Sequence, residues 1–289
     1  MSEQRLSVKK TYKLYIAGAF PRSESGRSYI VVDAKGGFLA NAARASRKDV
    51  RDAVVAARKA QSSWAAATAY NRGQVLYRVA EMLDGRRAQF AEEVASSEGT
   101  TPKQSAQSVD AAVDRWVWYA GWADKVAQVA GSSNPVAGPF FNFSVPEPTG
   151  VVGVIAPQSS SLLGLVSVLA PVLVTGNAVV LVASEERPLP AITLAEVLAT
   201  SDVPGGVVNL LTGRVGELSP VLAAHRDVDA LDLAGAPAEL LVELEQAAVT
   251  NVKRVLRPDR GGADWNAAPT PRRMLAFLET KTVWHPVGV

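Results

Sequence analysis

The sequence predicts an α/β fold, a doubly wound parallel sheet of the dinucleotide-binding type with a small arm of β-strands. Short runs rich in β-branched residues recur roughly every 20 to 30 residues in the second half of the chain, with helical stretches between them. This spacing is typical of βα units, whose parallel strands are buried on both faces. Two extended apolar segments, one on each side of the sheet region, predict the arm.

The first half of the chain is predicted to be mainly helical after a strand-like opening at 13–20 and 29–32. Ser46 and Asp49 have the spacing of a capping box, so a helix should begin there. Three further amphipathic helices are expected at 72–83, 86–97 and 101–129. The last contains aromatic side chains at helical spacing, which indicates packing and not a ligand site; they are Trp116, Trp118, Tyr119 and Trp122.

Five strands form the predicted sheet, at 151–156, 178–182, 207–211, 228–233 and 251–256. No GxGxxG follows the first strand, so the usual phosphate-binding fingerprint is missing. We therefore divide the chain into a sheet domain (1–137 and 147–258), an arm (138–146 and 275–289) and a linker rich in Gly, Pro and charge (259–274). An unpaired apolar arm is an aggregation hazard, so the arm should have a partner.

Composition excludes several kinds of site. The chain has 289 residues, with 30 Lys+Arg against 28 Asp+Glu. This balance lacks the excess of positive charge that binding to a nucleic-acid backbone requires. It has no cysteine and two histidines, which removes disulfides, thiolate metal sites and thiol nucleophiles. The longest apolar run, 162–174, is shorter than the roughly 20 residues of a membrane span, and no signal peptide is evident. We expect a cytoplasmic protein that binds neither nucleic acid nor a membrane.

The sequence resembles the aldehyde dehydrogenase family almost from end to end. The resemblance rests on YIAGAFPRSESGRSYIVVDAKGG, GPFFNFSVPEPTGVVGVIAP and GNAVVLVASEERPLPAITLAEVL, and on ETKTVWHP, which is similar to the family's final strand. It implies that the sheet is the family's N-terminal NAD-binding domain and that 138–146 and 275–289 are its oligomerisation arm. The linker 259–274 then stands where the family has its catalytic domain. In this the chain resembles the shortened second module of two-module aldehyde dehydrogenases.

The resemblance implies that the chain alone cannot oxidise aldehydes covalently. The family attacks the aldehyde with a cysteine thiolate, and this chain has no cysteine. The family's general base aligns with Pro258, which cannot take a proton, and its carbonyl-polarising asparagine aligns with Ser159. A serine nucleophile in Ser159–Ser161 would need His225 or His285 within hydrogen-bond reach, so a helix N-cap is the favoured interpretation of this serine run.

The resemblance also implies a weakened, vestigial cofactor site made of Ser159, Glu185, Gly213 and Gly235. Glu185 keeps the carboxylate that holds the adenosine ribose in the family, but Val182 replaces the neighbouring lysine. Gly213 is retained in the turn LTGRVGELS, whereas Val215 and Ser219 fall on glycine positions and should narrow the approach to a pyrophosphate. Gly235 is retained, with Ala236 in place of the family's serine, and we attribute it to a turn that needs a positive φ. No NAD(P) binding of normal affinity is expected, and residual binding is the alternative.

The function implied is a non-catalytic structural or regulatory subunit of a full-length aldehyde dehydrogenase. In the family each arm adds a strand to the neighbour's catalytic-domain sheet, and a symmetric homodimer of this chain would leave both arms unpaired, which favours a hetero-oligomer. Two alternatives are an oxidoreductase component that binds NAD(P) and acts only in a complex, and a decaying gene fragment. The arm residues expected to make the contact are Phe140, Phe141, Phe143, Phe277, Thr280, Val283 and Trp284.

Overall fold

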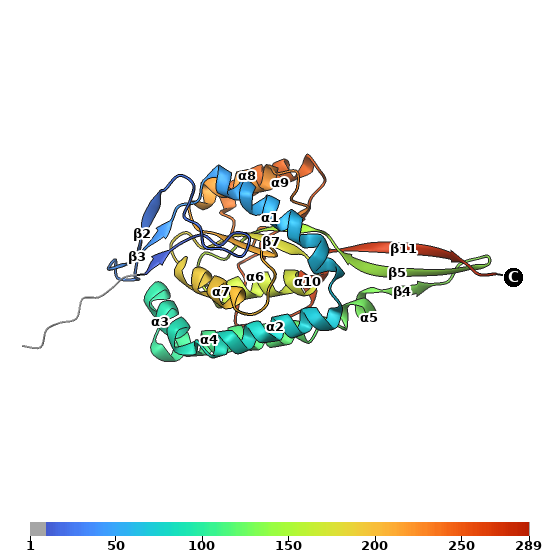
Figure 1. The fold of residues 1–289 in the computed structure, drawn as a ribbon, viewed down its shortest axis with the longest axis horizontal. Coiled ribbons are helices and arrows are strands. Elements are labelled where there is room, and N and C mark those ends of the chain that lie inside the picture. The colour runs from blue at the N-terminus through green and yellow to red at the C-terminus, as the bar shows by residue number, and fades with distance from the viewer. Residues whose placement is uncertain (1–9, 289) are drawn as a thin grey trace, which may run out of the picture.

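A five-stranded parallel sheet lies at the centre of the protein (Figure 1). The structure is a computed structural model that describes residues 10–288, so 1–9 and Val289, at the ends of the predicted sheet domain and arm, lie outside the described residues. The strands are ordered β10-β9-β6-β7-β8. The predicted fold class is therefore confirmed. The strands are β6 (Val151–Ile155), β7 (Ala178–Val182), β8 (Val208–Leu211), β9 (Ala230–Asp232) and β10 (Arg254–Leu256).

The sheet forms because its strands consist almost entirely of residues that can be buried on both faces. Every residue of β6 and β7 is buried, and their register pairs Val151 with Ala178. The chain order reverses between β6 and β9, which are paired through Val152 and Ala230. In open α/β sheets, ligands bind beyond the carboxyl ends of the strands at such a switch point.

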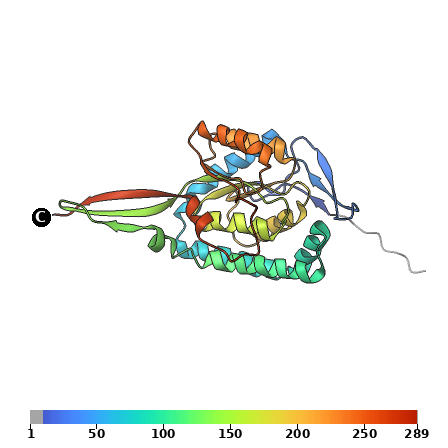
Figure 2. The same cartoon turned by 180° about the vertical axis from the view of Figure 1, so that it is seen from behind.

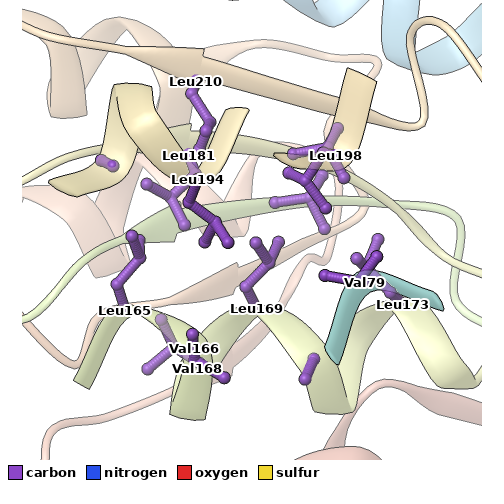
Figure 3. Packing of buried hydrophobic residues seen from close by; sticks show 14 of the residues in the cluster. Val79, Leu165, Val166, Val168, Leu169, Leu173, Leu181, Leu194, Leu198 and Leu210 are labelled. Carbon is purple, nitrogen blue, oxygen red and sulfur yellow. The ribbon is translucent and has the colours of Figure 1, made fainter. Parts of the chain in front are cut away.

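Helices cover both faces of the sheet (Figures 1 and 2). One face carries α6 (Leu163–Val174) and α7 (Leu189–Ala199), and the opposite face carries α1 (Arg47–Ala66), α8 (Val215–Ala224) and α9 (Leu241–Val249). A short 3-10 turn, η1 (Ala238–Leu240), precedes α9. Figure 3 shows how α6 packs beneath the sheet; the side chains that interdigitate there include Leu165, Leu169, Leu181, Leu194 and Leu210. This continuous apolar contact is the main stabilising term of the body.

The helices of the first half begin close to the predicted positions. The Ser46 hydroxyl accepts from the Lys48 and Asp49 amides, and Asp49 accepts from the Ser46 amide at 2.7 Å, which confirms the capping box. The other helices are α2 (Ala69–Asp84), α3 (Arg87–Glu98), α4 (Pro102–Ala120) and α5 (Val126–Ala130). The prediction of one helix over 101–129 is wrong, because the chain turns at Gly121, a poor helix former. Trp116 is fully buried, which confirms its packing role.

A second sheet at the N-terminal side has the order β1-β3-β2, from β1 (Thr11–Tyr12), β2 (Ser28–Val32) and β3 (Phe38–Ala43). The sequence did not predict β3. The predicted strand at 13–20 is wrong, because this segment folds back on itself: the Leu14 amide donates to the Pro21 carbonyl at 3.1 Å, and Ile16 pairs with Ala19. Gly18 permits the turn with a φ of +80°.

Three strands form an arm that projects from the body (Figure 2). They are β4 (Ser132–Asn134), β5 (Phe140–Pro148) and β11 (Leu278–Pro286), in the order β11-β5-β4. β11 pairs antiparallel with β5 from Leu278, opposite Pro148, to Pro286, opposite Phe140. The predicted pairing of the two extended segments is present, while β4 was not predicted. Within residues 10–288, no helix is both long and apolar enough to cross a membrane.

Glu93, on α3, has a buried carboxylate that joins three elements. Its Oε1 accepts from the Thr193 hydroxyl at 2.8 Å and from the Tyr12 hydroxyl at 3.1 Å. Its Oε2 is buried without a hydrogen-bond partner among residues 10–288. Burial raises the pKa of Glu93 above its ordinary value, against the opposing effect of these hydrogen bonds.

We expect Glu93 to make the protein less stable as the pH rises. Above pH 4.5, the ordinary value, the unfolded chain loses this proton while the native state still holds it. The free energy of unfolding should then fall with pH, by at most about 1.4 kcal/mol per pH unit, until the raised native pKa is passed. Urea unfolding between pH 4.5 and 8 should show a steeper fall in the wild type than in Glu93→Gln, which keeps only the contributions of other groups such as Asp232. The exposed neighbour supplies the control, since Glu92→Gln should keep the wild-type pH dependence.

Candidate functional site

The candidate cofactor residues gather beyond the carboxyl ends of the parallel strands. Ser159 follows β6, Glu185 follows β7, Gly213 follows β8 and Gly235 follows β9. Contacts connect the first three of these loops: the Glu185 amide donates to Gln158 Oε1 at 2.9 Å, and Glu185 also reaches the turn after Gly213. The topology thus brings residues that are far apart in sequence to one edge of the sheet.

The Glu185 carboxylate is already engaged within the chain. Its Oε2 accepts from the Val215 amide at 2.9 Å, and its Oε1 forms an ion pair with Arg214. Val215 is the first residue of α8, so Glu185 sits on the positive end of the helix dipole, where dinucleotide-binding folds place a pyrophosphate. The carboxylate raises the pKa of Arg214. A ligand anion would have to displace this pair.

Arg214 and Tyr29 are site residues that the sequence did not single out. The Arg214 guanidinium lies 5.8 Å from the centre of the Tyr29 ring, and both side chains line a cavity of about 390 Å³ with Glu185, Arg187 and Ser97. Burial raises the pKa of the Tyr29 hydroxyl. Arg214 directly follows the retained Gly213 in the turn LTGRVGELS, so a search for charged residues beside this glycine could have found it. Tyr29 is almost 200 residues away in sequence, and no sequence pattern connects it with this site.

The expected obstruction by Val215 and Ser219 is wrong. Both side chains are buried, and the Ser219 hydroxyl donates to the Val215 carbonyl at 2.6 Å inside α8. They therefore face the body and not the approach to the helix terminus, which Glu185 covers instead. Gly213 has a φ of +149°, and a Cβ there would lie 3.2 Å from the Ala45 amide nitrogen, so glycine is retained for conformation and space.

Gly235 is retained for a different reason from the one expected. It is not among the residues of positive φ; instead, a Cβ on it would lie 1.8 Å from the Ala156 carbonyl oxygen. Its amide donates to the Ile155 carbonyl at 2.9 Å. The loop after β9 thus packs against the loop after β6 at the switch point, and a side chain would force the two apart.

The serine run is not arranged for nucleophilic catalysis. Ser159 is exposed and its carbonyl accepts from Arg187 at 2.7 Å, while the Ser161 hydroxyl donates to Glu98 at 2.7 Å. The Ser160 hydroxyl accepts from the Gly164 amide at 2.9 Å, so Ser160, not Ser159, supports the start of α6. The histidines are elsewhere: His225 ends α8, and His285 lies on β11 in the arm.

Other catalytic elements are missing from the same edge. Pro258, the position of the expected general base, follows β10 at the start of the segment that leads to the arm, and the sequence contains no cysteine. Val182, at the expected lysine position, is fully buried. Across residues 10–288, no group of three or more His, Asp or Glu side chains could hold a metal ion. This edge offers no nucleophile–base pair of the kind that covalent catalysis needs.

The segment 257–277, which contains the predicted linker, is held on the body by side chains that the sequence did not reveal. Arg115 of α4 donates to the carbonyls of Trp265 and Ala267 at 3.0 and 2.8 Å. Arg273, in the short helix α10 (Arg272–Ala276), forms an ion pair with Asp232, which is fully buried at the end of β9. A flexible linker would not be tied in this way, so the connection between β10 and the arm has a fixed path.

The arm presents apolar side chains and an unpaired edge. Phe140, Phe141 and Trp284 are exposed, and the Phe140 and Trp284 rings lie 5.8 Å apart. Thr280 and Val283 occupy β11 opposite Pro146 and Phe143. The other long edge of β11 has no partner strand among residues 10–288. Phe277 is not an arm contact: it is fully buried in the core of the body, and its carbonyl accepts from Asn177 at 2.9 Å.

Comparison with known proteins shows which family this chain is similar to. A sequence model described as the aldehyde dehydrogenase family matches residues 21–259. The chain is 34% identical to human retinal dehydrogenase 2 over 86% of this chain and 48% of that protein. It is 32% identical to the mitochondrial benzaldehyde dehydrogenase of Antirrhinum majus over 84% of this chain and 46% of that protein. The chain therefore spans about half the length of these curated relatives.

The fold is also similar to solved structures. The NAD+ complex of an aldehyde dehydrogenase from Bacillus cereus superposes with a TM-score of 0.81 at 27% identity, over 85% of this chain and 50% of that one. The similarity leaves about half of the solved protein without a counterpart here.

Proposed function

The chain belongs to the aldehyde dehydrogenase family, and from this premise we propose that it is a catalytically deficient member that serves as a non-catalytic structural or regulatory subunit of a full-length NAD(P)-dependent aldehyde dehydrogenase. The observation that carries the proposal is the arm, whose long strand β11 has an edge without a partner in the described part of the chain, next to exposed aromatic side chains. An edge strand of this kind can both donate and accept main-chain hydrogen bonds with a strand of a partner's sheet. The missing thiol and the proline at the general-base position support the lack of catalysis.

Co-expression with a full-length aldehyde dehydrogenase from the same cell tests this proposal. Native mass spectrometry should find the two chains in a fixed ratio, and the complex should keep this ratio on dilution and rechromatography. Kinetics of the full-length enzyme with and without the chain then distinguish an activating from a stabilising role. A chain that stays monomeric or self-associates beside the full-length enzyme would overturn the subunit proposal.

An oxidoreductase component that binds NAD(P) and acts only in a complex is the second candidate, favoured by the retained Glu185 and Gly213. The residues present do not fit the cofactor in the observed arrangement. Glu185 is held by Arg214 and by the Val215 amide, and is therefore not free to bind a ribose. The α8 terminus that would receive a pyrophosphate already carries a carboxylate.

Breaking the pair should improve cofactor binding. In Arg214→Gln, Glu185 loses its ion pair and becomes available to a ribose, so we expect NAD+ to bind roughly tenfold more tightly than to the wild type, as measured by isothermal titration calorimetry. The matched control is Arg187→Gln, which removes the same charge from the same cavity without touching Glu185. If Arg214→Gln binds NAD+ no more tightly than this control, the pair does not limit the site.

A further inference from the structure

A second, larger cavity runs along the outer face of α8, between α1 and α9. Its volume is about 1,090 Å³, and it extends from Gly216 to His225. Figure 1 shows the three helices side by side on one face of the sheet. None of the candidate cofactor residues lines this cavity, and the proposed subunit function assigns no role to it.

Arginine side chains dominate the charge of this cavity. Arg27, Arg44, Arg47 and Arg51 line it, facing two glutamates, Glu217 on α8 and Glu243 on α9. Arg44 is neutralised by an ion pair with Glu217. Three arginines are then left against Glu243, in a chain whose formal net charge is only +2.

The remaining guanidinium groups have no partner of their own. Among residues 10–288, the side chains of Arg27, Arg47 and Arg51 make no hydrogen bond and no ion pair. Outside the cavity, only Arg22, Arg226 and Arg260 share this property in the described chain. Most other arginines here are paired, as Arg58 is with Asp229 and Arg86 with Glu196. The three arginines around this cavity therefore have guanidinium N–H groups that are available to donate hydrogen bonds to a ligand.

The start of α1 borders the cavity, but its charge is already compensated. Ser46 and Arg47 line the cavity, and the amino end of this 20-residue helix carries a partial positive charge. The Asp49 carboxylate in the first turn accepts from the Ser46 amide at 2.7 Å, and Glu24 accepts from the Ser46 hydroxyl at 3.0 Å. The donors available to an incoming anion are therefore the arginine side chains and not the capped amides of α1.

We propose that this cavity binds a small molecule with two or more phosphate groups, held by Arg27, Arg47 and Arg51. The planar guanidinium group donates two parallel hydrogen bonds to a phosphate, and three such groups can engage more than one phosphate at once. The volume of about 1,090 Å³ slightly exceeds the roughly 300 to 1,000 Å³ typical of small-molecule sites. Leu218, Val221 and Ala247 give the floor apolar surface for the rest of the ligand.

Titration calorimetry with inorganic tripolyphosphate, pyrophosphate and orthophosphate tests the proposal on the full chain. Affinity should rise with the number of phosphates and fall with added salt. In the double variant Arg47→Gln/Arg51→Gln, tripolyphosphate should bind at least roughly tenfold more weakly. The matched control is Arg22→Gln/Arg260→Gln, which removes the same charge from unpaired, exposed arginines outside the cavity and should bind as the wild type does.

Three outcomes would overturn the proposal. If tripolyphosphate binding weakens equally in both double variants, its affinity depends on the net charge of the protein and not on this cavity. No tripolyphosphate binding by the wild type would exclude the ligand class. Binding of an Asp/Glu-rich peptide with no binding of tripolyphosphate would assign the surface to an acidic protein partner instead. Because the substituted arginines are exposed, circular dichroism should show unchanged folding in each variant.

Discussion

Replacing Arg273 by alanine should lower the free energy of unfolding by about 3–5 kcal/mol. Arg273 is the ion-pair partner of Asp232, whose side chain is completely buried at the end of β9. Burial raises the pKa of Asp232, and the Arg273 charge opposes this rise. Without Arg273, the protein must either keep an uncompensated buried charge or protonate the carboxyl group, and both cost stability.

The loss should also release the segment that leads to the arm. The Arg273 guanidinium lies 5.7 Å from the centre of the Trp265 ring, in the same segment whose carbonyls Arg115 holds. In Arg273→Ala, the segment loses this ion pair and keeps the hydrogen bonds from Arg115 and from the Tyr119 hydroxyl to the Thr270 carbonyl. Limited proteolysis should then cut this segment before it cuts the rest of the body.

Urea unfolding measures the effect of Arg273→Ala, and the same segment supplies the control. Arg257 pairs with Glu245 on the surface, so Arg257→Ala should leave the unfolding curve almost unchanged. The double variant Asp232→Asn/Arg273→Met should recover much of the loss, because it removes the buried charge together with its partner. A loss in Arg273→Ala no greater than in Arg257→Ala would show that the Asp232 ion pair does not hold the segment.

Deleting residues 280–289 should abolish association with a full-length aldehyde dehydrogenase, under the subunit function proposed above. The deletion removes most of β11 and with it the free edge and Trp284. Association by strand addition depends on consecutive main-chain hydrogen bonds, so loss of most of β11 removes the edge that is proposed to dock. Native mass spectrometry of the co-expressed chains should find only separate species.

The starting point of this deletion follows from the position of Phe277. A deletion from residue 276 would remove Phe277 from the core and Leu278 from the base of the arm, and would destabilise the body itself. The variant Lys281→Ala is the control: it removes an exposed ion pair with Glu147 and leaves the strand intact, so association should persist. Retained association after the deletion, with the body still folded by circular dichroism, would contradict docking through the arm.

Local sequence patterns predicted much of the fold. The capping box at Ser46 and Asp49 fixed the start of α1, and the β-branched runs at 151–156 and 178–182 became the central strands β6 and β7. These features depend on neighbours within a few residues, so the sequence contains their cause. The strands β3 (FLANAA) and β4 (SSN) were missed because neither has the run of β-branched residues that indicates a strand, although each pairs with a nearby strand, β2 or β5.

The candidate site was also predicted only in part. The resemblance to the family implied a site made of Ser159, Glu185, Gly213 and Gly235, and the structure brings these residues to one edge of the sheet, because parallel strands end on the same side. The sequence could not show that Arg214 and the Val215 amide engage Glu185, nor that Gly235 is fixed by contact with Ala156. Those facts depend on how separate loops approach each other.

By itself, the sequence determined the α/β class, the family and the lack of a thiol nucleophile, because strand periodicity, motif order and residue counts are properties of the linear chain. Only the tertiary structure decided that Phe277 belongs to the core, that Arg273 neutralises Asp232, and that unpaired arginines meet around one cavity. The physical reason is that burial and electrostatic pairing depend on distances between residues that the chain separates and the fold brings together.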